Sequence, residues 1–366
     1  MKDLEAKINE TVIDGHLHIE GIYNERGEHF LKGFEEYRKT KGLKALNIAA
    51  LPSGKRDVAN NIFCAFYKLV NPQDFAHGGL VYTDYPAPNP APSDMTPLIQ
   101  YKELMEIGFD GIKMLEGKPQ LHKQISIPLC DDYFDEFFEA IEKDGTHLLF
   151  HVNDPEEFWD PAHATEELRR LGWFYGDGDY ASNEEVYRQI YAVLEKHPNL
   201  CATFAHFFFY SKQPRKLEDL FERYPNVCVD LTPGGEMYVS FTQNEELYME
   251  FFKKHNKRVM LGTDSTFPYA TGDFQWLCDR VYRYFATKDK LKSFCDLEIT
   301  GMNLPKEYRE NIFHKNFERR IGAQPKKINK EALNRYIEKY KHLIKEKEYL
   351  DEVERLQREL LGKCQE

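Results

Sequence analysis

The sequence predicts an α/β fold in which eight strand–helix units close into a (β/α)8 barrel followed by a helical extension. Short apolar, β-branched runs alternate with longer amphipathic stretches along most of the chain, which is the pattern of parallel strands joined by helices. A length of 366 residues, 42% of them hydrophobic, suits one large barrel with insertions. An open doubly wound sheet is the alternative, which we disfavour because no Gly-x-Gly-x-x-Gly follows the first expected strand.

Eight runs are expected to be strands because they are short, apolar and bounded by turn residues. They are Thr11–Asp14, Ala45–Leu51, Gly79–Thr83, Gly111–Leu115, Leu148–His151, Cys201–His206, Val227–Leu231 and Val259–Gly262. The amphipathic stretches between them are expected to be helices, namely His29–Thr40, Asp57–Leu69, Pro97–Ile107, Asp131–Lys143, Asn183–His197, Leu217–Tyr224, Asn244–His255 and Asp273–Ala286.

From about Gln324 the composition changes to Lys, Glu, Arg and Leu, and apolar residues recur at near-helical spacing. We therefore divide the chain into a barrel domain, 1–323, and a charged helical extension, 324–366. The extension is expected to form one or two amphipathic helices that pack on the barrel or on a second subunit of a homodimer. A mostly solvated charged helix is the alternative.

Two loops that follow expected strands stand out. Tyr85–Thr96 is rich in proline, and Val152–Ser182 carries Trp159 and several acidic residues. Long loops after barrel strands usually build or cover a binding site. We expect the second of them to contribute to such a site, with a surface insertion as the alternative.

Charge and composition argue against several classes of partner. A net charge of −12 argues against a nucleic-acid partner, which would require a basic face. No stretch approaches the roughly 18 consecutive apolar residues of a membrane span, and the charged start lacks the apolar core of a signal peptide. Seven scattered cysteines without a Cys-x-x-Cys pair favour a reducing cytoplasm and predict no thiolate metal site.

The strongest chemical signal is the segment Val12-Ile-Asp-Gly-His16-Leu-His18. Side chains two residues apart on an extended strand point the same way. His16 and His18 can therefore reach one metal ion together from the end of the first strand. Imidazole nitrogen suits zinc, and also iron, manganese or nickel.

Four further polar residues each close an apolar run, at the strand ends where barrel enzymes place catalytic groups. They are Lys113, His151, His206 and Asp264. Each one alone reads as a satisfied structural residue. Together with the first strand, however, five strand ends would point into one barrel mouth, which favours a functional site. His77 and His147 precede their expected strands and are assigned structural roles.

The order His-x-His, Lys, His, His, Asp over these strands resembles the amidohydrolase superfamily. The Asp14-Gly-His-x-His18 opening, Gly-Ile-Lys113 and Gly-Thr-Asp264 resemble its amidohydrolase-related branch. The segment Asn311 to Gly322 is similar to that branch's terminal helix. The resemblance covers about residues 10–323 and implies a TIM-barrel metal-dependent hydrolase.

The resemblance also implies the ligands. His16, His18, His151 and Asp264 match those of a first divalent metal, for which zinc is the favoured ion. His206 matches a second-metal ligand or a residue that orients substrate or water. Lys113 matches the position that bridges two metals when its amine is carboxylated. An equivalent lysine often does not bridge in this branch, so one ion is favoured.

On this basis the expected reaction is hydrolysis of a small carboxylate, amide or lactone by metal-activated water. Asp264 would be the general base and His206 would stabilise the oxyanion or orient the carbonyl. Because the branch contains decarboxylases, a non-oxidative decarboxylase of an aromatic or β-keto acid is the alternative. A non-catalytic barrel is disfavoured, since the ligand set is intact.

Four residues are candidates for contacting this small-molecule substrate. Arg26 in the first loop is a carboxylate clamp or an exposed arginine. Trp159 supplies an apolar wall or packs its own loop. His122, in the loop Gly117–Ile127, and Glu236, after the seventh strand, are placed to face the cavity.

Overall fold

The computed structural model describes residues 7–52, 57–82, 95–234, 236–268, 271–293 and 297–362. Within these residues, nine parallel strands form one curled sheet in the order β8-β7-β6-β5-β4-β3-β2-β1-β9. They are β1 (Ile13–Ile19), β2 (Ala45–Ala49), β3 (Phe75–Gly79), β4 (Gly111–Gly117), β5 (His147–Val152), β6 (Ala202–Phe204), β7 (Cys228–Asp230), β8 (Val259–Met260) and β9 (Ser265–Phe267). A separate antiparallel pair, β10 (Lys290–Lys292) and β11 (Glu298–Thr300), lies outside this sheet.

The eighth position of the barrel is shared by two short strands, because β8 pairs with β7 whereas β9 pairs with β1. Two backbone hydrogen bonds join the connecting segment to β1, from Gly15 N to Leu261 O (3.1 Å) and from Asp264 N to His16 O (2.9 Å). The strand is interrupted at Asp264, whose φ of 56° lies in the left-handed region. The sheet therefore closes on itself, and the predicted barrel fold is confirmed.

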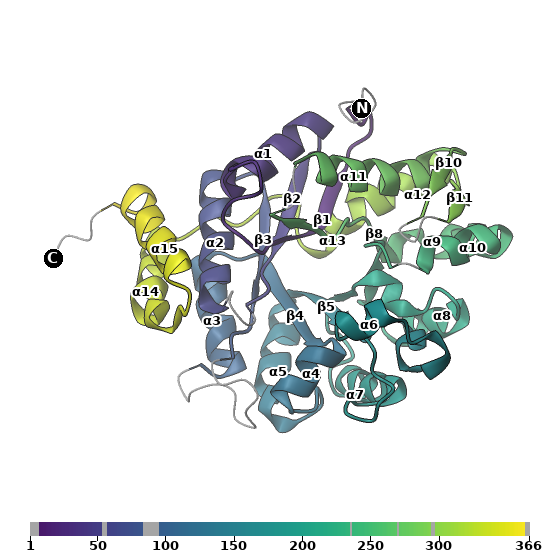
Figure 1. Ribbon diagram of the computed structural model, residues 1–366, viewed down its shortest axis with the longest axis horizontal. Coiled ribbons are helices and arrows are strands. Elements are labelled where there is room, and N and C mark those ends of the chain that lie inside the picture. The colour runs from purple at the N-terminus through teal and green to yellow at the C-terminus, as the bar shows by residue number, and fades with distance from the viewer. Residues whose placement is uncertain are drawn as a thin grey trace.

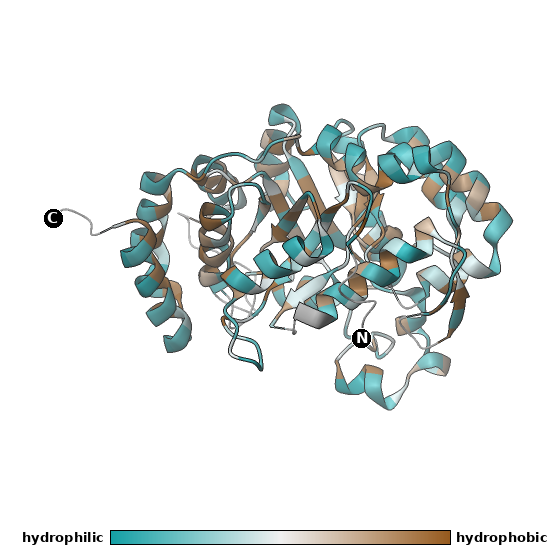
Figure 2. Ribbon diagram, turned by 90° about the horizontal axis from the view of Figure 1, so that it is seen from above, coloured by the Kyte–Doolittle hydropathy of each residue, from teal (hydrophilic) through white to brown (hydrophobic). Residues whose placement is uncertain are grey.

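Helices cover the outside of the sheet (Figure 1), and the brown, apolar strands occupy the centre of Figure 2. The α-helices of the barrel domain are α1 (Phe30–Lys41), α2 (Asp57–Val70), α3 (Pro97–Ile107), α4 (Pro119–Ile125), α5 (Asp135–Asp144), α6 (Glu166–Arg170), α7 (Asn183–Lys196), α8 (Pro214–Arg223), α9 (Met237–Gln243), α10 (Glu245–His255), α11 (Thr271–Ala286), α12 (Lys306–Glu310) and α13 (Asn316–Arg320). A π-helical turn, Asn311–Lys315, joins the last two of these helices. None of the described helices combines the length and apolar character needed to cross a membrane.

Local sequence signals explain why the expected helix Pro97–Ile107 has the same first and last residues as α3. The Thr96 side chain accepts a hydrogen bond from Ile99 N at the start of α3, and Pro97 occupies the first turn. Gly108, with a φ of 105°, ends the helix by donating to the carbonyls of Leu104 and Met105. The proline-rich loop predicted over 85–96 lies almost entirely outside the described residues.

The third strand was predicted over Gly79–Thr83, after His77, and this prediction is wrong by four residues. The observed strand β3 spans Phe75–Gly79 and includes His77. Two glycines and a histidine weaken the apolar signal of this strand. The His77 ring is buried in the barrel interior, with Nδ1 2.8 Å from Asn47 Oδ1 and Nε2 2.8 Å from His147 Nδ1. A buried polar network thus replaces the apolar contacts that sequence patterning detects.

Apolar side chains close one end of the barrel. Phe317 of α13 packs there with residues from five strands, namely Ile13, Ala45, Phe75, Cys228 and Met260. These residues lie at or near the amino-terminal ends of their strands. The opposite, carboxyl-terminal end is therefore the end that remains for a binding site.

The helical extension predicted after Gln324 is present as α14 (Lys330–Tyr340) and α15 (Lys347–Leu360). Both helices pack on the barrel domain beside α2 and α3, at the left of Figure 1. Arg335 pairs with Glu106 of α3 at 2.5 Å, and Asn61 of α2 donates to Tyr336 Oη at 3.3 Å. The extension thus covers one side of the barrel.

Candidate metal centre

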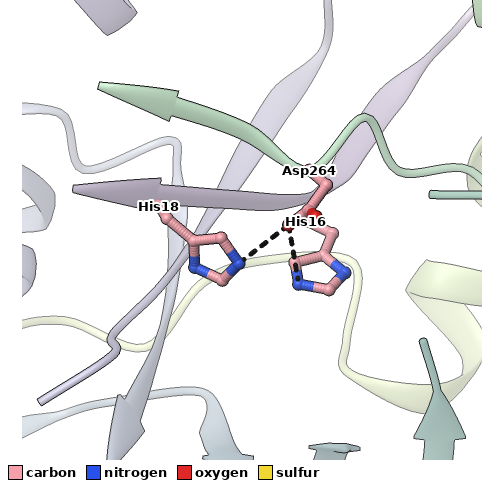
Figure 3. Close-up of side chains that lie close together, drawn as sticks. All are labelled: His16, His18 and Asp264. Carbon is pink, nitrogen blue, oxygen red and sulfur yellow. Dashed lines mark ion pairs between the residues drawn. The ribbon is translucent and has the colours of Figure 1, made fainter. Parts of the chain in front are cut away.

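Two histidines of β1 and one carboxylate converge at the carboxyl-terminal end of the barrel (Figure 3). Asp264 Oδ1 lies 3.0 Å from His18 Nε2 and 3.6 Å from His16 Nε2. The three potential ligand atoms lie within 4.8 Å of one another. Both histidines belong to β1 itself, which extends beyond its predicted end at Asp14. The alternation of side chains along a strand therefore places both rings on one face.

Each ring is oriented by a partner at its other nitrogen. His16 Nδ1 donates to Asp230 Oδ2 at 2.8 Å, and His18 Nδ1 donates to the carbonyl of Ala49 at 2.7 Å. These contacts leave the Nε2 lone pairs facing Asp264. Such a second hydrogen bond on each ring is the usual support of histidines that bind metal.

Burial favours the neutral form of three histidines of the site. It lowers the pKa of His16, His151 and His206 to about 4 each, and neighbouring charges modify that effect. Burial alone would raise the pKa of Asp264. Its close contacts with His18, His16 and His206 instead hold that pKa well below its usual range. Neutral imidazoles and an ionised carboxylate are the forms that coordinate a divalent cation.

Asp230 of β7 connects the two halves of the site. Its Oδ2 accepts from His16, and its Oδ1 accepts from the backbone N–H of His206 at 2.8 Å. Burial raises the pKa of this carboxyl, but the interaction with the His16 ring lowers it to about 2. Asp230 lies within the expected seventh strand, and the structure places its carboxylate against the His16 ring and the His206 backbone.

His151 and His206 lie beside the first three residues, with Nδ1 of His151 3.2 Å from Nε2 of His206. His206 Nε2 is 3.9 Å from Asp264 Oδ2, whereas His151 is not a member of the described cluster of three. His151 Nε2 faces the carbonyl of Asn153 at 2.9 Å. His151, which was predicted as a ligand of the first metal, thus contacts His206 instead of Asp264.

Lys113 lies on β4 with its Nζ 3.1 Å from His16 Nε2. Its side chain is buried, and that burial lowers its pKa to about 8 although Asp264 opposes the effect. A lysine with a lowered pKa is a better nucleophile near neutral pH. All five strand ends identified in the sequence therefore meet in one place.

An open cavity of about 1010 Å³ leads from this cluster to the surface. His18, Lys113, His151 and Asp264 belong to its lining at the cluster. None of the four residues proposed to contact substrate, which are Arg26, Trp159, His122 and Glu236, is among the described residues that line the cavity.

Their contacts explain the difference. Arg26 is exposed in the loop after β1, and Trp159 Nε1 donates to Ala181 O at 3.0 Å within its own insertion. His122 lies in α4 instead of a loop, and its Nε2 is 2.9 Å from Gln189 Oε1. Glu236 is largely buried after β7, and its Oε1 has no hydrogen-bond partner among the described residues.

Other residues line the cavity that sequence patterning did not identify. They are Lys118, Lys123, Trp173, Tyr180 and Tyr349, from α4 and its N-cap, the insertion after β5, and α15. Trp173 shares its insertion with Trp159, for which the sequence suggested either an apolar wall or packing within its own loop. Nothing in the pattern around Tyr349 distinguishes it from the other apolar positions of the extension.

Comparison with known proteins gives a family and a fold. The sequence matches the family described as Amidohydrolase over residues 85–319. An uncharacterized TIM-barrel protein from Bordetella bronchiseptica shares 13% identity and a TM-score of 0.53, over 85% of this chain and 98% of that chain. The apo form of IDCase from Metarhizium anisopliae shares 14% identity and a TM-score of 0.52, over 86% and 97%. No curated protein is significantly similar to the sequence.

Proposed function

This chain belongs to the amidohydrolase family, and from that premise we propose that it is a metal-dependent hydrolase of a small carboxylate, amide or lactone. One observation carries the proposal, namely the convergence of His16 Nε2, His18 Nε2 and Asp264 Oδ1 at the barrel mouth. Two imidazoles and a carboxylate form a donor set that suits zinc. The partners of both Nδ1 atoms support this assignment, because they turn the free lone pairs toward one point.

The hydrogen bonds around His206 support its assignment as a further ligand. The Thr232 hydroxyl donates its hydrogen to the ionised Asp230 carboxylate. Its oxygen must therefore accept a hydrogen bond from His206 Nδ1, which is 3.1 Å away. Neutral His206 therefore carries its proton on Nδ1 and a lone pair on Nε2. By the same reasoning His151 donates from Nε2 to Asn153 O and has a lone pair on Nδ1.

These two lone pairs face each other across 3.2 Å. Such an arrangement requires a positive group between or beside them, because two acceptors repel. We therefore assign His151 and His206 as donors for a second cation position next to the first. Lys113 lies beside His16 and, if carboxylated, would supply an oxygen ligand to both positions.

A divalent cation in this site would lower the pKa of water and polarise a substrate carbonyl. The chain supplies the remaining functions. The Oδ1 atom of Asp264 contacts the histidines of β1, whereas Oδ2 stays available, and about a third of the side chain is exposed to the cavity. Asp264 can therefore accept a proton at Oδ2 and release it to the leaving group as general base and then general acid.

Metal analysis of the purified protein and of a His16→Ala, His18→Ala variant tests this function. The wild type should retain zinc or another divalent ion, and the variant should lose the ion bound by β1. Hydrolysis of a panel of lactones, amides and carboxylate esters should stop on chelation and return when metal is added. Equal metal content in both proteins, or activity that resists chelation, would contradict the proposal.

A non-oxidative decarboxylase of an aromatic acid is the second candidate. The aromatic side chains of Trp173 and Tyr180 on the cavity wall favour it, since they suit a ring-bearing acid. The same metal-loaded protein, supplied with a panel of aromatic and β-keto acids, distinguishes the two reactions. Release of carbon dioxide without hydrolysis of the ester, amide and lactone panel would favour the decarboxylase.

A further inference from the structure

The cavity above the metal centre extends to the C-terminal extension, which lies outside the matched family region. Among the described lining residues, Tyr349 alone comes from this extension, where it belongs to α15. Trp173 and Tyr180, in the insertion after β5, also line the cavity. Figure 1 places α15 beyond α2, and places α6 of the insertion across the barrel from it.

Two contacts fix the Tyr349 ring. Its hydroxyl donates to the carbonyl of Glu20 at 3.1 Å, and Glu20 is two residues beyond His18. Its ring also packs edge-on against Phe63 of α2, with ring centroids 5.6 Å apart. The half-buried Tyr349 side chain is thereby held between the helical layer and the end of β1.

The helix that carries Tyr349 is anchored to the barrel at two further places. Glu352 Oε1 lies 2.9 Å from Nε2 of His29, the N-cap residue of α1, and Arg355 also pairs with Glu352. Before the helix, Lys345 N donates to Asp57 Oδ2 at 2.9 Å, at the start of α2. These contacts hold α15 in place, so Tyr349 presents a preorganised surface to the cavity.

The rest of the cavity wall also carries aromatic side chains, with lysines beside them. Lys118 and Lys123 lie close to its aromatic residues, with Lys123 Nζ 4.2 Å from the centre of the Tyr180 ring. Lys118 Nζ is 5.5 Å from the centre of the Trp173 ring. Aromatic surface beside cationic groups suits a flat, ring-bearing anion.

We propose that Tyr349 is a specificity-determining residue of this enzyme and that the C-terminal extension is therefore part of the substrate site. The Tyr349 ring forms a wall against which the part of the substrate remote from the reacting bond packs. This inference rests on the proposed function, because it takes the cavity above the metal centre as the substrate site. The ring supplies the contact, and the hydroxyl positions the ring through Glu20.

Binding of 1-naphthoate, a fluorescent aromatic carboxylate, tests the role of the ring. Its affinity is measured by fluorescence anisotropy on the full chain, once after chelation and once loaded with zinc. Tyr349→Ala should weaken 1-naphthoate binding about tenfold, because it removes an aromatic contact and its buried area. Tyr349→Phe keeps the ring and should stay within about threefold of wild type, since it removes the hydroxyl and its hydrogen bond to Glu20 but not the aromatic contact.

Leu350→Ala on the same helix is the matched control and should leave the affinity unchanged, because Leu350 packs against the core away from the described cavity lining. Circular dichroism and melting verify that each variant folds. Should Tyr349→Ala not fold, Tyr349→Leu serves in its place, with the same weakening expected from the loss of the ring.

Wild-type affinity in a folded Tyr349→Ala or Tyr349→Leu protein would overturn the inference, as would the absence of 1-naphthoate binding to the wild type. Failure of the proposed function has a different signature. In that case the protein holds no metal at His16 and His18, while the Tyr349 variants still weaken binding to the chelated protein.

Discussion

Among single residues, Asp230 has the widest influence on the site although it does not face the cavity. It accepts from the His16 ring and from the His206 backbone, and the Thr232 hydroxyl donates to it. One carboxylate thus orients donors from β1 and from the segment after β6. Because such supporting contacts set the tautomer and direction of a ligand, metal affinity depends on residues that never contact the ion.

The substitution Asp230→Asn isolates this effect. The amide keeps the size of the side chain but removes the charge that orients the His16 Nδ1 proton. We expect zinc affinity to fall by about 10- to 100-fold with the fold retained. Competition with a chromophoric chelator measures this, and Asp219→Asn, at an exposed position of α8, is the control. Equal zinc affinity in wild type and Asp230→Asn would show that Asp230 has no such role.

The two facing lone pairs of His151 and His206 predict the metal stoichiometry. If they hold a second cation, wild-type protein saturated with zinc in bicarbonate buffer contains two ions per chain, and His151→Ala contains one. The His16 and His18 rings are oriented by other partners, so the remaining ion should stay bound. Elemental analysis after gel filtration measures both ratios. A single ion in both proteins would support the one-metal arrangement favoured by the sequence.

At the scale of secondary-structure elements, the site depends on two irregularities. The left-handed backbone at Asp264 directly precedes β9, and the carboxylate projects across the barrel mouth toward β1. His206, two residues after the end of β6, also has a positive φ, of 56°. Such conformations are costly for residues other than glycine and cluster at functional sites.

The docking of α15 has a predictable dependence on pH. Burial raises the pKa of Glu352, but its hydrogen bonds with Arg355 and His29 lower that pKa to about 2 from 4.5. A carboxyl whose pKa is depressed on folding stabilises the folded state above its unfolded pKa, and that contribution is lost as the pH falls through the folded pKa. Glu352→Gln should therefore lower Tm at pH 7, and the difference from wild type should shrink between about pH 4.5 and pH 2.

Thermal melting of both proteins over this pH range measures the effect. Glu354→Gln, on the same helix in an exposed pair 3.9 Å long with Arg358, is the control and should change Tm little at any pH. A Glu352→Gln difference that stays constant with pH would mean that the charge of Glu352 does not contribute to docking.

For the whole molecule, sequence reasoning identified the barrel and the strand ends but not the contacts between distant segments. Lys113, His151, His206 and Asp264 were found because each closes an apolar run, and such runs are local features. The pairing of His16 with Asp230 joins residues 214 positions apart, and Tyr349 reaches the cavity from a helix whose pattern shows only that it is amphipathic. Those relationships follow from barrel closure and helix docking, which one-dimensional patterning does not describe.

The extension also contributes to the stability of the entire chain, which predicts the result of removing it. Its helices bury apolar side chains against the barrel, among them Leu333, Ile337, Tyr340, Val353 and Leu356, each with at most 1% of its surface exposed. Burying one such side chain contributes about 1.5–3 kcal/mol. The loss of five would approach the total stability of a typical domain, about 5–15 kcal/mol.

A chain that ends at residue 324 should therefore be insoluble or melt far below wild type, as measured by solubility and circular dichroism. Glu354→Ala with Arg358→Ala, which alters only the exposed face of α15, should melt near wild type; a truncated chain with wild-type Tm would show that the barrel does not need the extension.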